Sequence, residues 1–136
     1  MSGIFLTNDF DVIAEQLKYY SISVDVYKEL KEPILYSKND VLLFNKYGML
    51  LFNDSKLKIL YINTKYRKKG KGSEFIIKME SVLKEKSINV INALIPTDKL
   101  EFYTKNGFVE ISRFVNYIKV KKELWTLNLL KRKSSK

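Results

Sequence analysis

The stretch from residue 57 to residue 95 constrains the fold more than any other part of the sequence. Residues 57–63 form an apolar run typical of a strand, and residues 66–72 follow as a polar loop with two glycines. Residues 73–86 then repeat apolar side chains at helical spacing. Residues 90–95 are almost continuously apolar, which predicts a strand buried on both faces. A strand–helix–strand crossover of this kind makes its two strands parallel neighbours in one sheet.

The segments before this crossover predict antiparallel strands. Residues 4–7 form a short apolar run, and Asn8 or Asp9 then caps a helix. Residues 41–45 and 49–53 are strand-like and separated by a tight turn, so they form a meander with the strand at 57–63. Residues 22–30 fit a strand or a short helix.

The segments after the crossover predict a short helix and two strands. Asp98 and Glu101 are spaced as in a capping box, and Gly107 suits the residue that follows a helix end. Residues 108–120 predict one long strand, and residues 124–130 predict a final strand, with a short helix as the alternative. The fold class is therefore α+β, with a mixed, mostly antiparallel sheet.

Composition limits the chemistry that the chain can perform. Its 136 residues favour one domain over residues 1–130, followed by a basic tail at 131–136. Cysteine and histidine are absent, which excludes disulfides, thiolate metal ligands, a cysteine nucleophile and a Ser-His-Asp triad. No run reaches the ~18–20 apolar residues of a membrane span, and no leader segment is visible. We expect a soluble, cytoplasmic protein without a metal site.

The net charge of +10 comes from 25 basic and 15 acidic residues. Among the basic residues only Arg67, Arg113 and Arg132 are arginine, and the chain is also rich in Ile, Asn and Tyr. Such a bias is typical of an AT-rich coding sequence, so we interpret most of the charge as compositional, with a phosphate-rich partner as the alternative. Local clusters of charge are more informative than the total.

The loop between the first crossover strand and the helix has the features of an anion site. The first amides of a helix lack internal partners, and glycines let the preceding backbone curl around a phosphate. Arg67, Lys68, Lys69 and Lys71 add positive charge around Gly70 and Gly72. A Walker A loop needs Ser or Thr where Gly72 stands, and a dinucleotide fingerprint needs glycine where Phe75 stands. The alternative is a plain glycine turn in a lysine-rich chain.

A second pattern, Phe102-Tyr103-x-x-x-Gly107-Phe108, lies about thirty residues downstream. Alone it fits local packing around a helix end. At this spacing, however, the two patterns together resemble those of the GNAT superfamily of acyl-CoA-dependent N-acetyltransferases. The resemblance covers roughly residues 41–130 and is nearest to amino-terminal acetyltransferases of the ribosomal-protein type. It implies helices on both faces of the sheet and two central parallel strands that splay around a CoA site.

The resemblance also implies roles for particular residues. Backbone amides of the loop would hold the CoA pyrophosphate, and the last strand before the loop would pair with the pantetheine arm. Tyr103 would be the general acid near the sulfur, and Tyr117 is a candidate substrate contact. The implied CoA-binding residues are Leu60, Tyr61, Ile62, Arg67, Lys68, Lys69, Gly70, Lys71, Gly72 and Ser73.

The sequence departs from the family pattern at two points. Pro96 stands where many members carry an asparagine that contacts CoA, and neither crossover strand carries a carboxylate that could serve as general base. Asp54, Glu101 and Tyr117 are the remaining candidates for that base. A water relay, or an acceptor amine that is already neutral, would make a side-chain base unnecessary.

The leading functional hypothesis is therefore direct acetyl transfer from acetyl-CoA to an amine in a ternary complex. The acceptor class stays open between a protein N-terminus, a lysine and a small amine, with aminoacyl-tRNA as a further option. The alternatives are a non-catalytic CoA-binding protein and a nucleic-acid-binding module. The last is disfavoured because the aromatic residues occupy core-like positions instead of forming an exposed stacking set. We expect no membrane partner, and a monomer or a homodimer.

Overall fold

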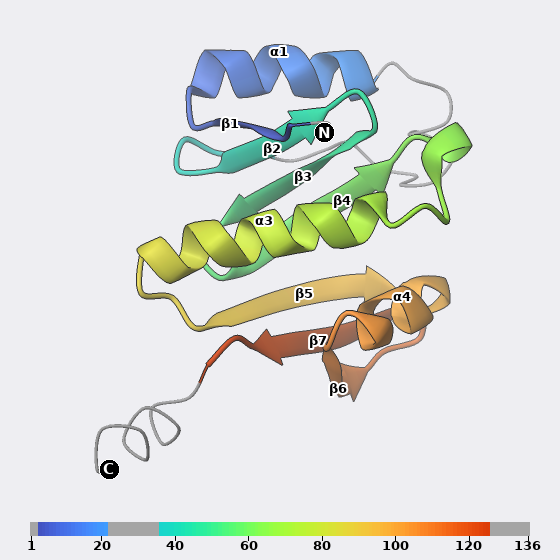
Figure 1. The fold of residues 1–136 in the computed structure, drawn as a ribbon. Helices are drawn as coiled ribbons and strands as arrows, with labels where there is room; N and C mark the ends of the chain where they lie inside the picture. Colours follow the sequence, from blue (N-terminus) through green and yellow to red (C-terminus); the bar gives the residue numbers. More distant parts are fainter. Residues whose placement is uncertain (1–2, 22–35, 126–136) are drawn as a thin grey trace. The chain divides into compact units, whose positions relative to one another are not determined.

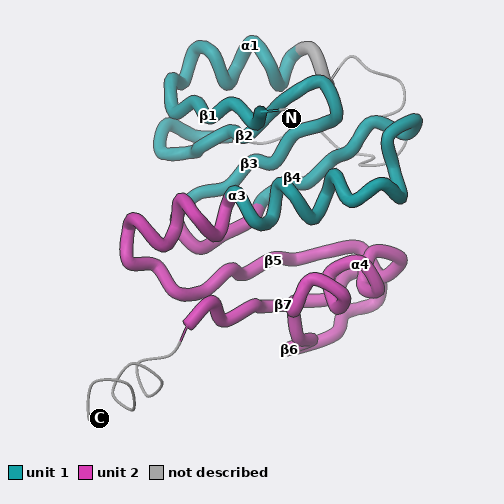
Figure 2. The backbone as a smooth tube through the Cα atoms, in the orientation of Figure 1, with its two compact units in different colours: residues 1–53, 58–78 teal, residues 54–57, 79–136 magenta. Residues whose placement is uncertain are grey.

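The computed structural model describes residues 3–21 and 36–125, which form an α+β fold (Figure 1). The residue contacts divide these residues into two compact units, each described by itself: unit 1 holds residues up to 53 and 58–78, and unit 2 holds 54–57 and those from 79 onward (Figure 2). The elements in chain order are β1 (Phe5–Thr7), α1 (Phe10–Ser21), β2 (Val41–Asn45), β3 (Gly48–Asn53), β4 (Lys56–Ile62), η1 (Thr64–Tyr66), α3 (Lys71–Glu85), β5 (Val90–Pro96), η2 (Thr97–Lys99), α4 (Leu100–Lys105), β6 (Val109–Arg113) and β7 (Tyr117–Glu123).

The sheet is mixed and mostly antiparallel, as the sequence predicted. Its strands are hydrogen-bonded in the order β1-β2-β3-β4-β5-β7-β6. The pairs β1–β2, β2–β3, β5–β7 and β6–β7 are antiparallel. The crossover pair β4–β5 is parallel, and its register is Lys56 opposite Asn92 and Leu57 opposite Ala93. The predicted parallel strands are thus confirmed, whereas their splaying beyond Leu57 concerns the placement of the two units and stays a prediction.

In unit 1, α1 begins where the sequence predicted. The Asp9 carboxylate accepts hydrogen bonds from the amides of Asp11 (2.9 Å) and Val12 (3.2 Å), so Asp9 is the N-cap. One face of the helix is apolar and packs on β2, β3 and β4. The buried cluster comprises Ile13, Leu17, Leu42, Met49, Leu51 and Tyr61. Residues 22–30, for which a strand or a helix was predicted, lie outside the described residues, as do the tail at 131–136 and most of 124–130.

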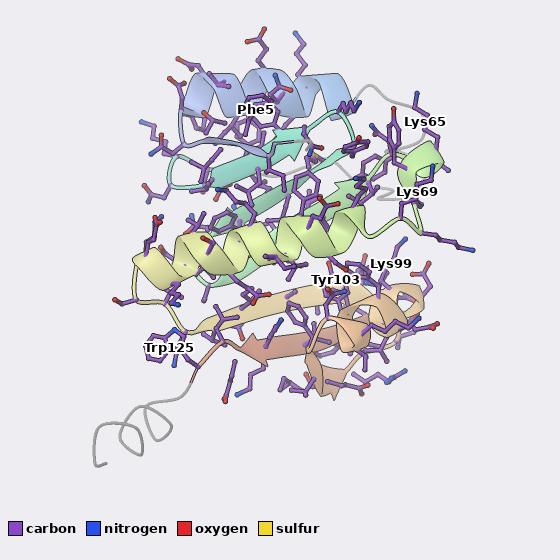
Figure 3. The ribbon with its side chains drawn as sticks, in the orientation of Figure 1. Phe5, Lys65, Lys69, Lys99, Tyr103 and Trp125 are labelled. Atoms are coloured by element: carbon purple, nitrogen blue, oxygen red, sulfur yellow. The ribbon has the colours of Figure 1, made fainter. Side chains whose placement is uncertain are left out.

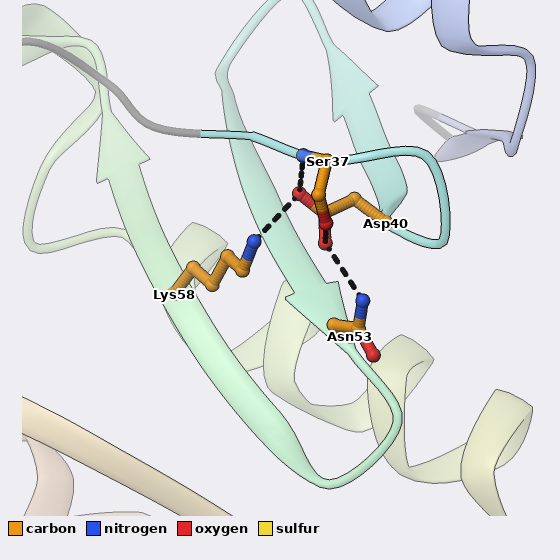
Figure 4. A network of polar contacts seen from close by, with 4 residues as sticks. All are labelled: Ser37, Asp40, Asn53 and Lys58. Atoms are coloured by element: carbon orange, nitrogen blue, oxygen red, sulfur yellow. Dashed lines mark hydrogen bonds and ion pairs between the residues drawn. The ribbon is translucent and has the colours of Figure 1, made fainter.

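A buried polar network joins the start of β2 to β3 and β4 in unit 1 (Figure 4). The Asp40 carboxylate is fully buried. It accepts hydrogen bonds from the Ser37 amide (2.8 Å) and from Asn53 Nδ2 (3.0 Å), and it forms an ion pair with Lys58 Nζ (2.8 Å). Burial alone would raise the pKa of Asp40, but these hydrogen bonds outweigh it and lower the pKa. The network therefore holds a charged carboxylate inside the sheet.

In unit 2, α4 ends in a Schellman motif at the predicted glycine. The Phe108 amide donates to the Tyr103 carbonyl (3.0 Å), and the Gly107 amide donates to the Thr104 carbonyl (3.1 Å). Gly107 has φ +90°, which other residues rarely adopt. The predicted capping box at the other end is wrong. Thr97–Lys99 form the 3₁₀ turn η2, and neither Asp98 nor any other side chain caps η2 or α4.

The predicted strand at 108–120 is wrong, because the chain turns back inside it. The structure has the hairpin β6–β7 there, with Arg113 opposite Ile118 and the Phe114 amide bonded to the Tyr117 carbonyl (2.8 Å). The predicted final strand does not begin at Leu124, since β7 ends at Glu123. The turn contains neither glycine nor proline, and it includes the apolar residues Phe114 and Val115, so the sequence gives no strong signal of the reversal.

Two smaller expectations also need correction. β5 is not buried on both faces: its burial alternates, and Leu94 is 56% exposed while Ile91 and Ile95 are buried. Helix α3 begins at Lys71, two residues before the predicted start, so that Gly72 lies inside its first turn. Among the described helices, none is both long and apolar enough to cross a membrane.

Candidate phosphate-binding site

The loop from Arg67 to Gly70 connects η1 to α3 in unit 1 and has a curled backbone. Lys68 (φ +63°) and Gly70 (φ +78°) are both left-handed. The first hydrogen bond into α3 runs from the Glu74 amide to the Gly70 carbonyl (3.1 Å). The amides at 71–73 therefore precede the helical ladder and stand at the positive end of the helix dipole. Successive amides in such a turn form a concave anion-binding surface.

Two of the four predicted cations hold the loop itself. Arg67 Nε donates to the Ile62 carbonyl (2.8 Å), and its guanidinium lies over the Tyr61 ring at 5.3 Å. Lys71 pairs with Glu74 (3.3 Å) and lies over the Tyr47 ring at 4.3 Å. These side chains tie the loop to β4 and to the β2–β3 turn, so they act first as structural contacts.

Lys68 and Lys69 are the cations that remain available to a ligand. Both side chains are exposed, and neither has an ion pair or ring contact within residues 3–21 and 36–125. Figure 3 shows Lys69 on the loop directly before α3. Two ammonium groups without an ion pair among the described residues, next to the three amides that precede the helical ladder, are suited to a phosphate group.

The end of β4 comes shortly before this loop in the chain. The Tyr61 side chain is buried in the core cluster with Ile13 and Leu17. Leu60 and Ile62 are half-buried, and their side chains point to the opposite face because strand residues alternate. The Tyr61 ring is therefore part of the core, and the pairing of β4 with a pantetheine arm stays a prediction.

Tyr103 lies in unit 2 on α4 and is 6% exposed (Figure 3). Its ring makes edge contacts with Phe102 (5.1 Å) and Phe108 (5.2 Å). Burial raises the pKa of the Tyr103 hydroxyl, so it stays protonated at neutral pH. That hydroxyl makes no hydrogen bond within the described part of the chain. The hydroxyl therefore carries a proton that it could donate, and its proximity to a bound thioester stays a prediction.

The candidate bases do not form a site. Asp54 is an exposed turn residue with φ +45°, and Glu101 pairs with Lys105 (3.1 Å) along α4. Tyr117 begins β7, opposite Pro96, and is 40% exposed. All three side chains are exposed.

Asp40 is a buried carboxylate that sequence reasoning missed. Its ion pair with Lys58 and its lowered pKa make it a poor proton acceptor, so its role is structural. The only signal in the sequence is an acidic residue directly before an apolar run. No group of three or more acidic side chains gathers as metal ligands would in residues 3–21 and 36–125.

Comparison with known proteins bears on the fold. The sequence matches no protein-family model and no curated protein. Among solved structures, an assigned N-acetyltransferase from Lactobacillus plantarum matches with a TM-score of 0.71 at 12% identity, over 90% of this chain and 98% of that one. A GNAT-family acetyltransferase from Staphylococcus aureus matches at 0.62 and 18% identity, over 90% and 100% of the two chains.

A third structure is the PaiA N-acetyltransferase from Thermoplasma acidophilum, which was solved in complex with coenzyme A. It matches with a TM-score of 0.62 at 17% identity, over 89% of this chain and 99% of that one. The chain has the GNAT fold. The GNAT resemblance drawn from the Arg67–Gly72 and Phe102–Phe108 patterns is thereby confirmed for the architecture.

Proposed function

We propose that the protein is an acetyl-CoA-dependent N-acetyltransferase that passes an acetyl group directly to an amine acceptor in a ternary complex. The observation that carries the proposal is the loop before α3. Its left-handed Lys68 and Gly70, the first amides of α3 and the exposed Lys68 and Lys69 would form a phosphate cradle on a GNAT fold. The coenzyme A bound to the Thermoplasma acidophilum neighbour supports the choice of ligand.

The residues of the cradle suit the pyrophosphate of CoA. The amides from Lys68 to Ser73 would bind the phosphate oxygens, with Lys68 and Lys69 neutralising their charge. The Arg67 amide already donates to the Thr64 carbonyl (3.3 Å), so Arg67 would act through its side chain. Arg67 and Lys71 would keep the loop in its binding conformation through their contacts with β4 and the β2–β3 turn. The β4 backbone at Leu60, Tyr61 and Ile62 would pair with the pantetheine arm.

The chemistry needs few protein groups. The acceptor nitrogen bonds to the acetyl carbon, the carbon–sulfur bond breaks, and the sulfur takes a proton from the Tyr103 hydroxyl, which then regains one from solvent. The proton lost by the new amide passes to solvent, directly or through water. Direct transfer fits a chain without cysteine, since no thiol is present to carry the acetyl group.

Binding of CoA tests the proposal, with Gly72 as the residue to change. Gly72→Glu places a carboxylate in the first turn of α3, where it repels the pyrophosphate. We expect CoA affinity to fall about 100-fold or more, since one charged hydrogen bond is worth ~1.5–3 kcal/mol. Calorimetry with CoA measures it. Gly72→Gln adds a similar bulk without charge, and Ser81→Glu adds the same charge on an exposed part of α3.

Unchanged affinity in a folded Gly72→Glu protein would remove the loop from the CoA site. Equal losses in the Gly72→Glu and Ser81→Glu proteins would point to net charge instead of position. Mass spectrometry of the purified wild-type protein for co-bound CoA gives an independent measurement.

A non-catalytic CoA-binding protein is the second candidate function. The observation that favours it is that neither β4 nor β5 carries an acidic residue. The other candidate bases, Asp54, Glu101 and Tyr117, are exposed. Turnover of acetyl-CoA against a panel of peptide N-termini, lysine peptides, polyamines and aminoacyl-tRNA separates the two. Acetylated product from any of these acceptors supports the enzyme, and CoA binding without product from all of them supports the binding protein.

A further inference from the structure

We infer that Tyr47, in the β2–β3 turn, is a positioning residue that holds the phosphate-binding loop in its binding conformation. The inference deepens the proposed function and rests on it. Tyr47 lies some twenty residues before the loop in sequence and belongs to neither pattern that indicated CoA binding. All the contacts that carry the inference lie within unit 1.

The backbone of the β2–β3 turn is bonded to the end of β4. The Asn63 amide donates to the Tyr47 carbonyl (2.8 Å), and Asn63 Nδ2 donates to the Lys46 carbonyl (2.8 Å). Gly48 packs so closely on β4 that a Cβ there would stand 2.1 Å from the Tyr61 carbonyl oxygen. The turn is therefore a rigid support for whatever its side chains contact.

The Tyr47 ring contacts the chain on both sides of the loop. Before the loop, it meets the Tyr66 ring edge-on, with centroids 4.7 Å apart. After the loop, Lys71 Nζ lies 4.3 Å from its centroid. Glu74 accepts the same ammonium group at 3.3 Å, so Lys71 is held from two directions. One aromatic ring thus fixes the entry and the exit of residues 67–70.

A loop held at both ends loses less entropy when it binds. Lys68 and Gly70 adopt left-handed backbone conformations, which a free chain would populate only in part. A ligand that binds a preorganised loop does not bear the cost of ordering it. The predicted consequence of losing the Tyr47 ring is weaker binding of phosphate-bearing ligands, without loss of any group that touches them.

The test compares calorimetric CoA affinity for the wild-type protein with that for Tyr47→Phe and Tyr47→Ala. We expect Tyr47→Ala to bind about tenfold more weakly, because an aromatic pair and a cation–π contact are both lost. Tyr47→Phe keeps both contacts and should bind within about twofold of wild type. Inorganic pyrophosphate, measured by competition, should weaken by the same factor as CoA, since it meets the loop alone. Tyr47→Leu replaces Tyr47→Ala if the alanine variant does not fold.

Tyr36→Ala is the matched control, since it removes another half-exposed tyrosine of unit 1, one that contacts the Phe10 ring at 5.4 Å. Its melting temperature should fall about as much as that of Tyr47→Ala, with CoA affinity unchanged. Unchanged CoA or pyrophosphate affinity in a folded Tyr47→Ala protein would overturn the inference, as would an equal loss in Tyr36→Ala. A wild-type protein that does not bind CoA would instead overturn the proposed function and, with it, this inference.

Discussion

Tyr103 shows how one residue can satisfy local packing and a proposed catalytic role together. Its carbonyl accepts the Phe108 amide in the Schellman motif, and its ring packs against Phe108 as that motif favours. The Phe102–Phe108 pattern is therefore a helix end with its own physical rationale. The hydroxyl is the part of the residue that this packing does not use, and burial keeps it protonated.

Tyr103→Phe should lower acetyl transfer while sparing CoA affinity. Losing a positioned general acid costs ~10²–10⁴ in rate. A thiol of pKa about 8.5 is a fair leaving group unaided, so we expect the low end of that range. The ring and its contacts remain, and the melting temperature should move little. Single-turnover rates with the best acceptor check this. A folded variant that reacts at the full rate would show that Tyr103 only lines the proposed CoA site.

Gly48 illustrates a requirement for space instead of conformational freedom. Its φ is not among the positive values, yet an added Cβ would collide with the Tyr61 carbonyl at 2.1 Å. Gly48→Ala should therefore destabilise the protein by about 3 kcal/mol, as overpacking against fixed backbone does. Gly3→Ala, where nothing lies within 4 Å of the new Cβ, is the control and should be close to neutral. Urea denaturation of the two variants measures the difference.

At the scale of the elements, the Asp40 network joins three strands at one point. Ser37 and Asp40 precede β2, Asn53 ends β3, and Lys58 lies on β4. A buried carboxylate left without these partners would be costly, so the network favours the register in which all of them meet. Hydrogen bonds and the ion pair here serve specificity of strand placement as well as stability.

Asp40→Asn should lower the free energy of unfolding by about 3 kcal/mol at pH 7, because it leaves Lys58 half-buried without a counter-charge. Because the folded-state pKa of Asp40 is lowered, the stability it contributes is present above its unfolded value of about 3.9 and is lost as the pH falls through the folded value. Urea denaturation from pH 7 to pH 2 should show a larger loss of stability in the wild type than in the variant. Asp54→Asn removes the same charge from an exposed turn and should change little. A variant as stable as wild type at pH 7 would contradict the expectation.

At the scale of the whole molecule, we interpret most of the net charge of +10 as compositional and not as a nucleic-acid footprint. Several lysines are paired with carboxylates, including Lys58 with Asp40, Lys71 with Glu74 and Lys122 with Glu80. The unpaired cations that matter for the proposal, Lys68 and Lys69, sit at the helix amides of the candidate phosphate site.

We therefore expect binding to tRNA that carries no amino acid to be weak and without sequence preference at physiological salt. A phosphate-rich partner would instead show a slope of log K against log salt of about −0.9 per neutralised phosphate on duplex, or −0.7 on single strands. Fluorescence anisotropy over a salt series measures the slope. A submicromolar, salt-sensitive complex would contradict the expectation and favour aminoacyl-tRNA as the acceptor.

The sequence alone predicted the elements whose signals are local. Apolar runs separated by turns located β2, β3 and β4. Asn8 or Asp9 located the start of α1, and Gly107 located the end of α4, because capping and turn chemistry act within a few residues. The strand–helix–strand spacing predicted the parallel pair β4–β5. The glycine-bearing loop predicted the candidate phosphate site for the same reason, since helix amides and flanking cations are neighbours in sequence.

Only the tertiary structure decided what depends on partners from distant segments. Residues 108–120 form the hairpin β6–β7 instead of one long strand. The turn carries no glycine or proline, so the pairing between the two halves sets the reversal. Arg67 and Lys71 hold the loop, whereas Lys68 and Lys69 are available to a ligand. This division depends on Tyr47 in the β2–β3 turn and on Tyr61 in β4. The charged state of Asp40 depends on Lys58 in the same way. A sequence states which groups exist, but burial and pairing decide their energies, and both are set only when the chain has folded.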